Sequence, residues 1–199
     1  MNAPHETSLP ILLREDSGGV AKLTLNRPSQ FNSLSEEMLI ELQSALDAIA
    51  GDPAVRVVVI GGAGKAFCAG HDLKQMRANH SKAYMQKLFK QCGRMMMRIV
   101  EMPQPVIARV HGIATAAGCQ LVAMCDLAVA GEGARFAVSG INLGLFCSTP
   151  SVALGRAMLF NPHWPWAAAA KLGGQVTPPP QYARSAPAST RGLFASPKG

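Results

Sequence analysis

Two short turns carry small residues at spacings that could place backbone N–H groups to stabilise an oxyanion. Each follows an apolar run and precedes a predicted helix: residues 68–72 (CAGHD) and residues 116–120 (AAGCQ). Small side chains let a substrate approach the backbone, and the start of a helix leaves its first N–H groups unpaired. Two such N–H groups facing one point would stabilise a developing oxyanion. Close strand-to-helix packing is the commoner use of such turns, so their spacing alone does not assign a site.

Six apolar segments predict the strands that must position these turns. The β-branched run at residues 55–60 (VRVVVI) has no polar face, which is typical of a central strand. Residues 17–19 (SGG) predict a hairpin turn between the first two strands. Strands that alternate with helices predict an α/β core of stacked crossover units. The predicted strands are residues 11–14, 20–25, 55–60, 106–110, 127–130 and 136–138.

Three helices follow from capping signals and apolar spacing. Ser33, with Glu36 three residues later, forms a capping box that would begin the first helix. A second helix should cover residues 72–100, with an interruption at Gly93. The third covers residues 114–124, whose small side chains suit close packing.

Length and charge restrict the classes of function. The chain has 199 residues, 48% hydrophobic and 16% charged, which supports one or two domains with a real core. No apolar run reaches the roughly 18 residues of a membrane helix, so we expect a soluble protein without a membrane partner. Of the net charge of +7, residues 155–199 contribute five basic residues and no acid. This basicity belongs mostly to the tail and does not indicate a nucleic-acid binder.

Cysteine spacing and terminal composition give further expectations. Five cysteines without a CxxC pair predict neither a disulfide framework nor a metal site. Residues 1–10 (MNAPHETSLP) lack an apolar secretory core and an Arg-rich presequence, so we expect a cytoplasmic location. Seven of the 14 prolines and both tryptophans lie beyond residue 154. We therefore expect a core at residues 1–154 and a poorly ordered, Pro/Ala-rich basic tail at residues 155–199.

Several ordered motifs resemble the enoyl-CoA hydratase/isomerase family, which has the crotonase fold. Residues 26–28 (NRP) and 31–34 (FNSL) resemble the family's first loop and helix start. The longer motifs are residues 66–76 (AFCAGHDLKQM), 111–130 (HGIATAAGCQLVAMCDLAVA) and 135–150 (RFAVSGINLGLFCSTP). The resemblance covers residues 10–154 and implies an α/β fold, a crotonase-like (ClpP/crotonase) spiral of ββα units with a truncated or degenerate C-terminal region.

The resemblance also implies a site for a fatty acyl-CoA thioester, in fatty-acid metabolism. The backbone N–H groups of His71 and Ala117 match the family's two oxyanion-hole donors. Only the amide of His71 is needed, and we expect its ring to be a satisfied polar group. No separate cofactor is implied, because coenzyme A is part of the substrate. The residues that match the lining of the CoA pocket are Ser29, Phe31, Ala69, His71, Asp72, Leu73, Ala117 and Gly118.

The resemblance stops after residue 154, where family members continue in helices that close the acyl pocket and build trimers. The family's trimer or hexamer is therefore an open question for this chain. We expect residues 155–199 to come from a shifted reading frame or a truncated gene, with a divergent natural terminus as the alternative.

Both glutamates that the family's hydratases use as acid and base are replaced. Gln120 occupies the first position and Gly140 the second. Glutamine does not exchange a proton near neutral pH, and glycine has no side chain to do so. Each missing role would cost a factor of about 10²–10⁴ in rate. We therefore do not expect efficient hydration. Another lyase or isomerase reaction, such as decarboxylation or isomerisation, or thioester hydrolysis stays open, with His111 or Gln120 as a polar helper. A noncatalytic acyl-CoA-binding role stays open as well.

The second predicted helix is strongly basic. Residues 73–100 contain seven basic residues and no acid. Lys87, Lys90, Arg94 and Arg98 would share one helical face. A solvated face is the simplest interpretation, attraction of CoA phosphates the second, and an RNA-associated role the third. Aromatic residues for base stacking are sparse in this segment, so we do not expect a nucleic-acid partner.

Overall fold

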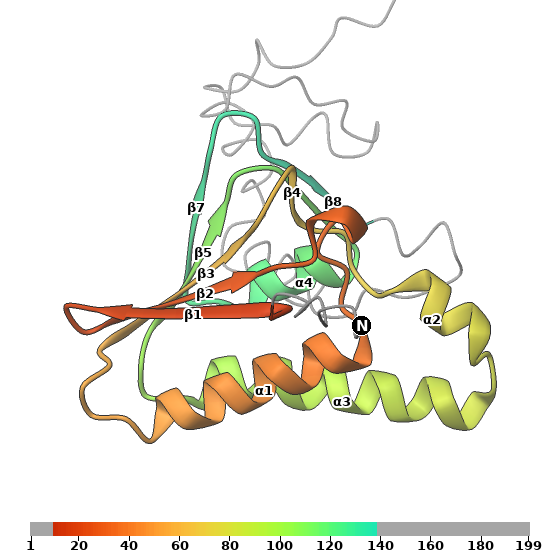
Figure 1. The fold of residues 1–199 in the computed structure, drawn as a ribbon, viewed down its shortest axis with the longest axis horizontal. Coiled ribbons are helices and arrows are strands. Elements are labelled where there is room, and N and C mark those ends of the chain that lie inside the picture. The colour runs from red at the N-terminus through yellow and green to blue at the C-terminus, as the bar shows by residue number, and fades with distance from the viewer. Residues whose placement is uncertain (1–9, 139–199) are drawn as a thin grey trace, which may run out of the picture. The chain divides into compact units, whose positions relative to one another are not determined.

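Two layers of strands form the core of the computed structural model, which describes residues 10–138 (Figure 1). The larger sheet has the order β1-β2-β3-β5-β7, and the smaller has the order β4-β6-β8. Among these strands only β1 and β2 pair antiparallel, as the predicted hairpin requires. The larger sheet contains β1 (Leu12–Ser17), β2 (Val20–Leu25), β3 (Val57–Gly62), β5 (Val106–Val110) and β7 (Leu127–Ala130). The smaller contains β4 (Ala66–Cys68), β6 (Ile113–Thr115) and β8 (Arg135–Ala137).

The chain passes repeatedly from the larger sheet to the smaller one. β3 is followed by β4, β5 by β6, and β7 by β8, and helices follow the first two of these strand pairs. These helices are α2 (Leu73–Ala78) and α3 (Lys82–Glu101) after β4, and α4 (Ala117–Met124) after β6. This is the spiral of ββα units that the resemblance implies, and β3 is the central strand of its sheet, as predicted.

Helix α1 (Glu36–Ala50) closes one side of the core, beside α3 (Figure 1). Five of its apolar side chains are buried at helical spacing: Met38, Leu39, Leu42, Leu46 and Ile49. None of the five has any exposed surface. Burial of each is worth about 1.5–3 kcal/mol against leaving it in water, which is what holds α1 in place.

Several boundaries differ from the predicted ones: β3 covers residues 57–62 rather than 55–60, and β4 and β6 lie where no strand was predicted. Ser35, not Ser33, is the N-cap of α1, and its hydroxyl accepts from the Met38 N–H at 3.3 Å. The long second helix is interrupted at residues 79–81, because Ser81 caps a new helix. Gly93 lies within α3 and does not break it. The predicted third helix begins later, at Ala117, because residues 113–115 form β6.

Some predictions fall on residues that the structure does not describe. Residues 1–9 and 139–199, which include Gly140 and the whole predicted tail, lie outside the described residues. The division at residue 154 therefore stays a prediction. Among the helices at residues 10–138, none is long and apolar enough to cross a membrane.

Candidate functional site

The two small-residue turns lie against each other. Gly118, the second residue of α4, packs so closely on Cys68 that an added Cβ would overlap the Cys68 carbonyl oxygen. An added Cβ on Gly70 would lie 3.1 Å from the backbone nitrogen of Ala117. Gly70 also has φ +93°, a conformation that side chains disfavour. Glycine at both positions therefore brings the backbone of residues 68–71 against the beginning of α4.

An isolated parallel β-bridge pairs Leu34 with His71 and leaves the His71 backbone N–H without a partner among the described residues. In this bridge the Leu34 N–H donates to the Gly70 carbonyl at 2.8 Å, and the Leu34 carbonyl accepts from the Asp72 N–H at 3.2 Å. In such a bridge the partner's own N–H and C=O point to the opposite side. Within residues 10–138, no acceptor takes the N–H of His71.

The amide of Ala117 is free for a different reason. Ala117 is the first residue of α4, where an N–H has no partner within the helix. The chain enters the helix through Ala116, which has φ 50° and ψ −123°. This positive-φ backbone is unusual for alanine, and such conformations are common near functional sites. Across the described ranges no acceptor takes the Ala117 N–H either, so both matched donors are unpaired and belong to turns in contact.

A buried asparagine fixes the loop that carries Ser29 and Phe31. Asn32 has no exposed surface, and its Nδ2 donates to the carbonyls of Ala63 and Ala66, both at 2.8 Å. The Ala69 N–H donates to the Phe31 carbonyl at 3.0 Å, which attaches the loop to the first small-residue turn. Phe31 keeps 54% of its surface exposed and is free to meet a ligand. Sequence reasoning missed the role of Asn32, although asparagine favours the left-handed backbone (φ 54°) seen here.

An ion pair with little exposure joins the same two loops. The Arg27 guanidinium donates to Asp72 Oδ2 at 3.0 Å, and the two side chains are 18% and 13% exposed. Arg27 also donates to the Ser33 carbonyl at 2.9 Å, which explains why Ser33 does not cap α1. Burial by itself would raise the pKa of the Asp72 carboxyl. The N–H of Gln75 and the Arg27 side chain outweigh burial, and the pKa lies below its usual range.

We expect Asp72→Asn to lower the free energy of unfolding by about 2 kcal/mol at neutral pH. The variant keeps an N-cap for α2 but leaves Arg27 without its charge partner. The expected loss of stability lies between that of breaking an exposed ion pair and that of breaking a buried one. Because the pKa of Asp72 is depressed in the folded state, its contribution is present above the unfolded pKa of about 4 and is lost as pH falls through the folded value. Urea unfolding at neutral and acidic pH measures both effects.

The exposed pair of Arg14 and Asp16, joined at 2.6 Å, supplies the matched control. Asp16→Asn should cost less than about 1 kcal/mol. Equal losses in the two variants would show that the Arg27–Asp72 pair has no special role in holding the loops.

The structure places the predicted site residues in one region, apart from His111 and Gly140. Asp72 caps α2, and Leu73 is its first residue, with an exposed side chain. Ser29 lies in the short 3-10 helix η1 (Pro28–Gln30), and Gln120 is half-buried on α4, three residues after Ala117. His111 is exposed, and its Nε2 lies 2.8 Å from the Gly64 carbonyl, which suits a structural role. Gly140 lies outside the described residues.

The His71 ring differs from the satisfied polar group that we expected. Its Nδ1 is buried and has no hydrogen-bond partner among the described residues. The ring packs edge-on against Phe89 of α3, with centroids 5.3 Å apart and planes at 75°. Burial lowers the pKa of this imidazole, and the backbone of Leu34 opposes the shift only in part.

Three of the cysteines, Cys68, Cys92 and Cys125, are not activated nucleophiles. Burial raises the pKa of the thiols of Cys68, Cys92 and Cys125 to about 12. A thiol at that pKa holds almost no thiolate near neutral pH. These three residues act as small apolar side chains of the core.

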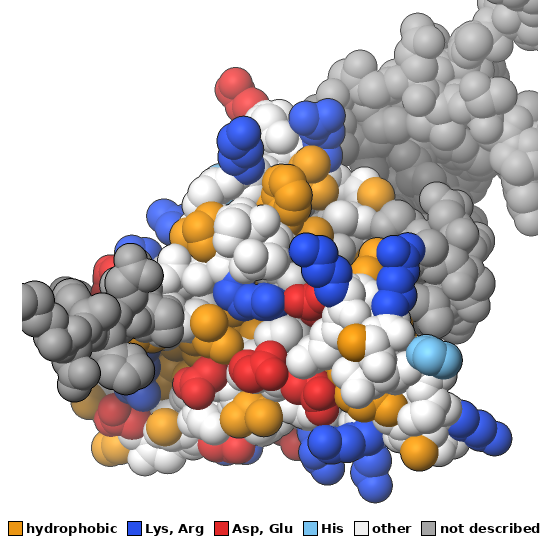
Figure 2. Space-filling model, turned by 45° about the vertical axis from the view of Figure 1, so that its right-hand side comes forward, with side chains coloured by type: hydrophobic (Ala, Val, Ile, Leu, Met, Phe, Trp, Pro, Cys, Tyr) orange, Lys and Arg blue, Asp and Glu red, His pale blue; other side chains and the backbone are white. Residues whose placement is uncertain are grey.

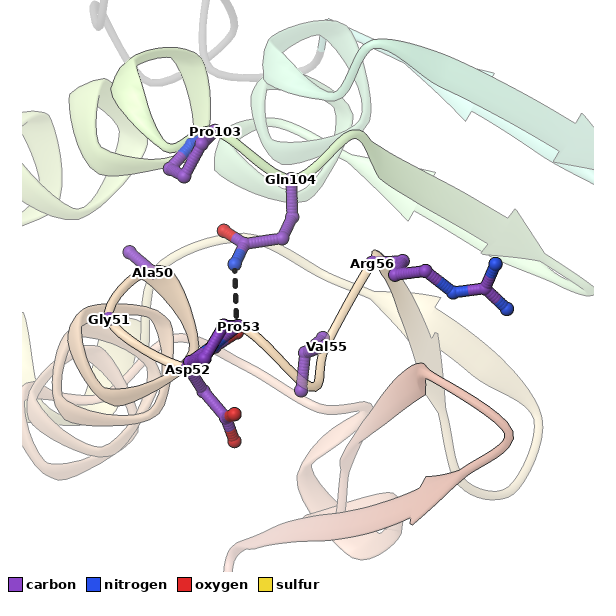
Figure 3. A pocket seen from close by; sticks show the side chains of 8 residues that line it. All are labelled: Ala50, Gly51, Asp52, Pro53, Val55, Arg56, Pro103 and Gln104. Atoms are coloured by element: carbon purple, nitrogen blue, oxygen red, sulfur yellow. Dashed lines mark hydrogen bonds between the residues drawn. The ribbon is translucent and has the colours of Figure 1, made fainter.

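An open groove lies away from these residues, at the end of α1 (Figure 3). Its volume is about 620 Å³, and none of the predicted site residues lines it. Gln104 Nε2 donates to the Ile49 carbonyl at 2.9 Å and to the Asp52 carbonyl at 3.4 Å, which ties the segment before β5 to the end of α1. We interpret the groove as a junction between elements.

The basic face of α3 is partly neutralised. Lys87 Nζ lies 3.3 Å from Glu36 Oε1, and Arg98 Nε lies 2.7 Å from Asp47 Oδ1, both acids of α1. Figure 2 shows acidic and basic side chains next to one another on the face in view. Two of the four basic residues predicted to form a stripe thus pair with α1, which weakens the argument for an RNA track.

Comparison with known proteins adds a family match. The family model described as enoyl-CoA hydratase/isomerase matches residues 15–157. Enoyl-CoA hydratase domain-containing protein 3, mitochondrial, of Xenopus laevis is 45% identical over 79% of this chain and 53% of its own length. The human protein of the same name is 46% identical over 70% of this chain and 46% of its own. The sequence motifs point to this branch of the family, and these matches confirm it.

Solved structures agree with the sequence matches. An enoyl-CoA hydratase of Mycobacterium smegmatis is 64% identical, with a TM-score of 0.71 over 74% of this chain and 58% of that one. Human enoyl coenzyme A hydratase domain-containing protein 3 is 44% identical, with a TM-score of 0.69 over the same shares. The chain spans about half the length of the curated relatives that it matches.

Proposed function

Because the chain belongs to the enoyl-CoA hydratase/isomerase family, we propose that it binds a fatty acyl-CoA thioester and polarises its carbonyl with the N–H groups of His71 and Ala117. The observation that carries this proposal is the contact between the two turns, with both N–H groups unpaired within residues 10–138. Two fixed donors favour the oxyanion over the neutral carbonyl, and in measured systems one such donor is worth about 3–4 kcal/mol in the transition state.

The loops around the two donors would hold the rest of the ligand. Residues 28–33 are attached to residues 69–72 by the Ala69–Phe31 hydrogen bond and the Arg27–Asp72 pair. These links support a pocket in which Ser29, Phe31 and Leu73 would lie near the donors, as the family resemblance implies for the CoA pocket. The second small-residue turn contributes the backbone of Ala117 and Gly118. The ligand's thioester would thus meet only main-chain groups, and its CoA portion would meet the side chains.

We do not assign efficient hydration to this site. Gln120 and Gly140 stand where the family's hydratases have glutamates, and neither side chain transfers protons at neutral pH. The proposed class is a thioester-polarising lyase or isomerase of the family, or an acyl-CoA-binding protein without turnover. A cytoplasmic location stays a prediction from the N-terminal sequence, while the vertebrate relatives are named mitochondrial.

The carbonyl stretch of a bound thioester tests the proposal directly. Butyryl-CoA labelled with ¹³C at its carbonyl should show a stretching band at lower wavenumber when bound to the full chain, because hydrogen bonds weaken the C=O bond. Ala117→Pro removes one donor at the first position of a helix, where proline is tolerated. We expect it to reduce this shift and to weaken binding by about tenfold, the value of one hydrogen bond.

Ala117→Ser keeps the N–H and is the matched control, which should retain the wild-type shift. Comparison of melting temperatures ensures that both variants are folded. An unshifted carbonyl in the wild-type complex, or equal shifts in the two variants, would show that these amides do not form an oxyanion hole.

A further inference from the structure

Glu36, the first residue of α1, makes polar contacts to which the proposed function gives no role. Its carboxylate accepts from the Tyr84 hydroxyl at 3.2 Å and from Lys87 Nζ at 3.3 Å, both on α3. Its backbone carbonyl accepts from Gln91 Nε2 of the same helix at 3.1 Å. Its N–H, which has no partner within a helix at this position, donates to Gln75 Oε1 of α2 at 2.9 Å. Every polar group of Glu36 thus contacts the two helices that follow the first small-residue turn.

Helix α3, which Glu36 holds, also packs against His71. Phe89 of α3 lies edge-on to the His71 ring, with centroids 5.3 Å apart. At about 100° per residue, Phe89 and the three residues of α3 that contact Glu36 lie on opposite flanks of the buried face of this helix. A rotation of α3 about its axis would therefore break the contacts with Glu36 and move Phe89 away from the ring.

We propose that Glu36 is a positioning residue for the proposed oxyanion hole. It holds α3 and Phe89 against His71, and this packing keeps the His71 N–H directed at the thioester oxygen. The inference rests on the proposed function, because it concerns the placement of one of the two proposed donors. It assigns to Glu36 an effect on ligand binding that is separate from its effect on the stability of the fold.

His71 is held from two directions, and both depend on residues 34–36. The bridge to Leu34 holds the backbone on either side of His71, through the Gly70 carbonyl and the Asp72 N–H. The ring is engaged by the Leu34 backbone and packs against Phe89. Because Leu34 lies only two residues before Glu36, one short segment sets both the bridge and the position of α3. Removal of the Glu36 side chain should loosen the packing on Phe89 and leave the bridge in place.

The contact with Tyr84 should carry more of this effect than the contact with Lys87. The side chain of Glu36 is 21% exposed, whereas that of Lys87 is 73% exposed. Exposed ion pairs contribute little, because water and salt screen the charges. The hydrogen bond from the Tyr84 hydroxyl is partly buried, so water replaces it less readily. An uncharged acceptor at position 36 should therefore be enough to hold α3.

The affinity and carbonyl band of ¹³C-labelled butyryl-CoA bound to the full chain test the proposal. We expect Glu36→Ala to weaken binding about fivefold and to reduce the shift of the band, because the His71 N–H is then less well directed. Glu36→Gln, which keeps an acceptor oxygen for the Tyr84 hydroxyl, should retain the affinity and the band. Tyr84→Phe should resemble Glu36→Ala, and the two changes combined should have little further effect, because both remove the same contact.

Asp47→Ala is the matched control, because it breaks another ion pair between α1 and α3, that of Asp47 with Arg98. Arg98 lies about 13 Å further along α3 than Phe89. This variant should lower the melting temperature to a similar extent as Glu36→Ala but leave the band and the affinity unchanged. A wild-type band and affinity in Glu36→Ala, or an equal loss of affinity in Asp47→Ala, overturns the positioning role alone. An unshifted band in the wild-type complex overturns the proposed function as well.

Discussion

Gly118→Ala is expected to lower the free energy of unfolding by about 3 kcal/mol and to abolish thioester binding. The new methyl group would overlap the carbonyl oxygen of Cys68 and lie 2.7 Å from its carbonyl carbon. Both atoms belong to the backbone of a buried strand end, so neither can rotate away. Overpacking of this kind typically costs about 1–3 kcal/mol, and rigid neighbours place this site at the upper end. Urea unfolding and titration with butyryl-CoA measure the two effects.

The loss of binding has a geometric cause. Relief of the overlap requires α4 to move away from residues 68–71. That movement separates the Ala117 amide from the His71 amide, and the two can then no longer meet one oxygen. The variant should therefore lose the shifted thioester carbonyl band even under conditions where it is fully folded.

Gly93→Ala is the matched control within the same chain. Gly93 lies within α3, is exposed, and has no atom near an added Cβ. Alanine is a better helix former by about 0.5–1 kcal/mol, so this variant should be more stable than the wild type. If Gly118→Ala and Gly93→Ala both stabilise the protein, the close packing of α4 on Cys68 is not present in solution.

The second large effect concerns hydration of crotonyl-CoA. We expect the wild-type chain to hydrate it slowly and the double variant Gln120→Glu, Gly140→Glu to be faster by about 10² or more. Each glutamate would restore an acid–base role worth about 10²–10⁴ in rate. The increase in each single variant should be much smaller than in the double, because groups that act as a unit are not additive.

A double variant with two added side chains but no titrating group is the matched control. Gln120→Met, Gly140→Met places side chains of similar length at both positions, and it should not accelerate hydration. Rapid hydration by the wild-type chain would contradict the interpretation that the replaced glutamates prevent this reaction. Measurement of kcat and KM for each variant separates a change in chemistry from a change in binding.

Local patterns in the sequence predict much of the fold. The strands at residues 106–110 and 127–130 have the predicted bounds, and the central position of β3 follows from its uniformly apolar run. The ββα spiral follows from the family resemblance rather than from periodicity. These features depend on short-range spacing or on motifs, both of which are visible along one chain.

The parts that sequence reasoning missed depend on contacts between distant residues. Ser33 has the spacing of an N-cap, but its segment is held by Arg27, and Ser35 caps the helix instead. Asn32 secures two carbonyls more than 30 positions away. The sequence predicts that the His71 ring has hydrogen-bond partners. Nothing in the local sequence indicates that its Nδ1 has none among the described residues. Such features are tertiary, and propensity does not encode them.

Both proposed donors to the thioester are main-chain groups, and this has a consequence for inheritance. Every codon except those for proline specifies an amide N–H, so few mutations can delete the oxyanion hole in the way that they delete a catalytic side chain. The hereditary information for it resides in the residues that let two backbone segments touch, above all Gly70 and Gly118. A lineage can therefore exchange its acid–base side chains and adopt new reactions while the anchoring of the thioester persists.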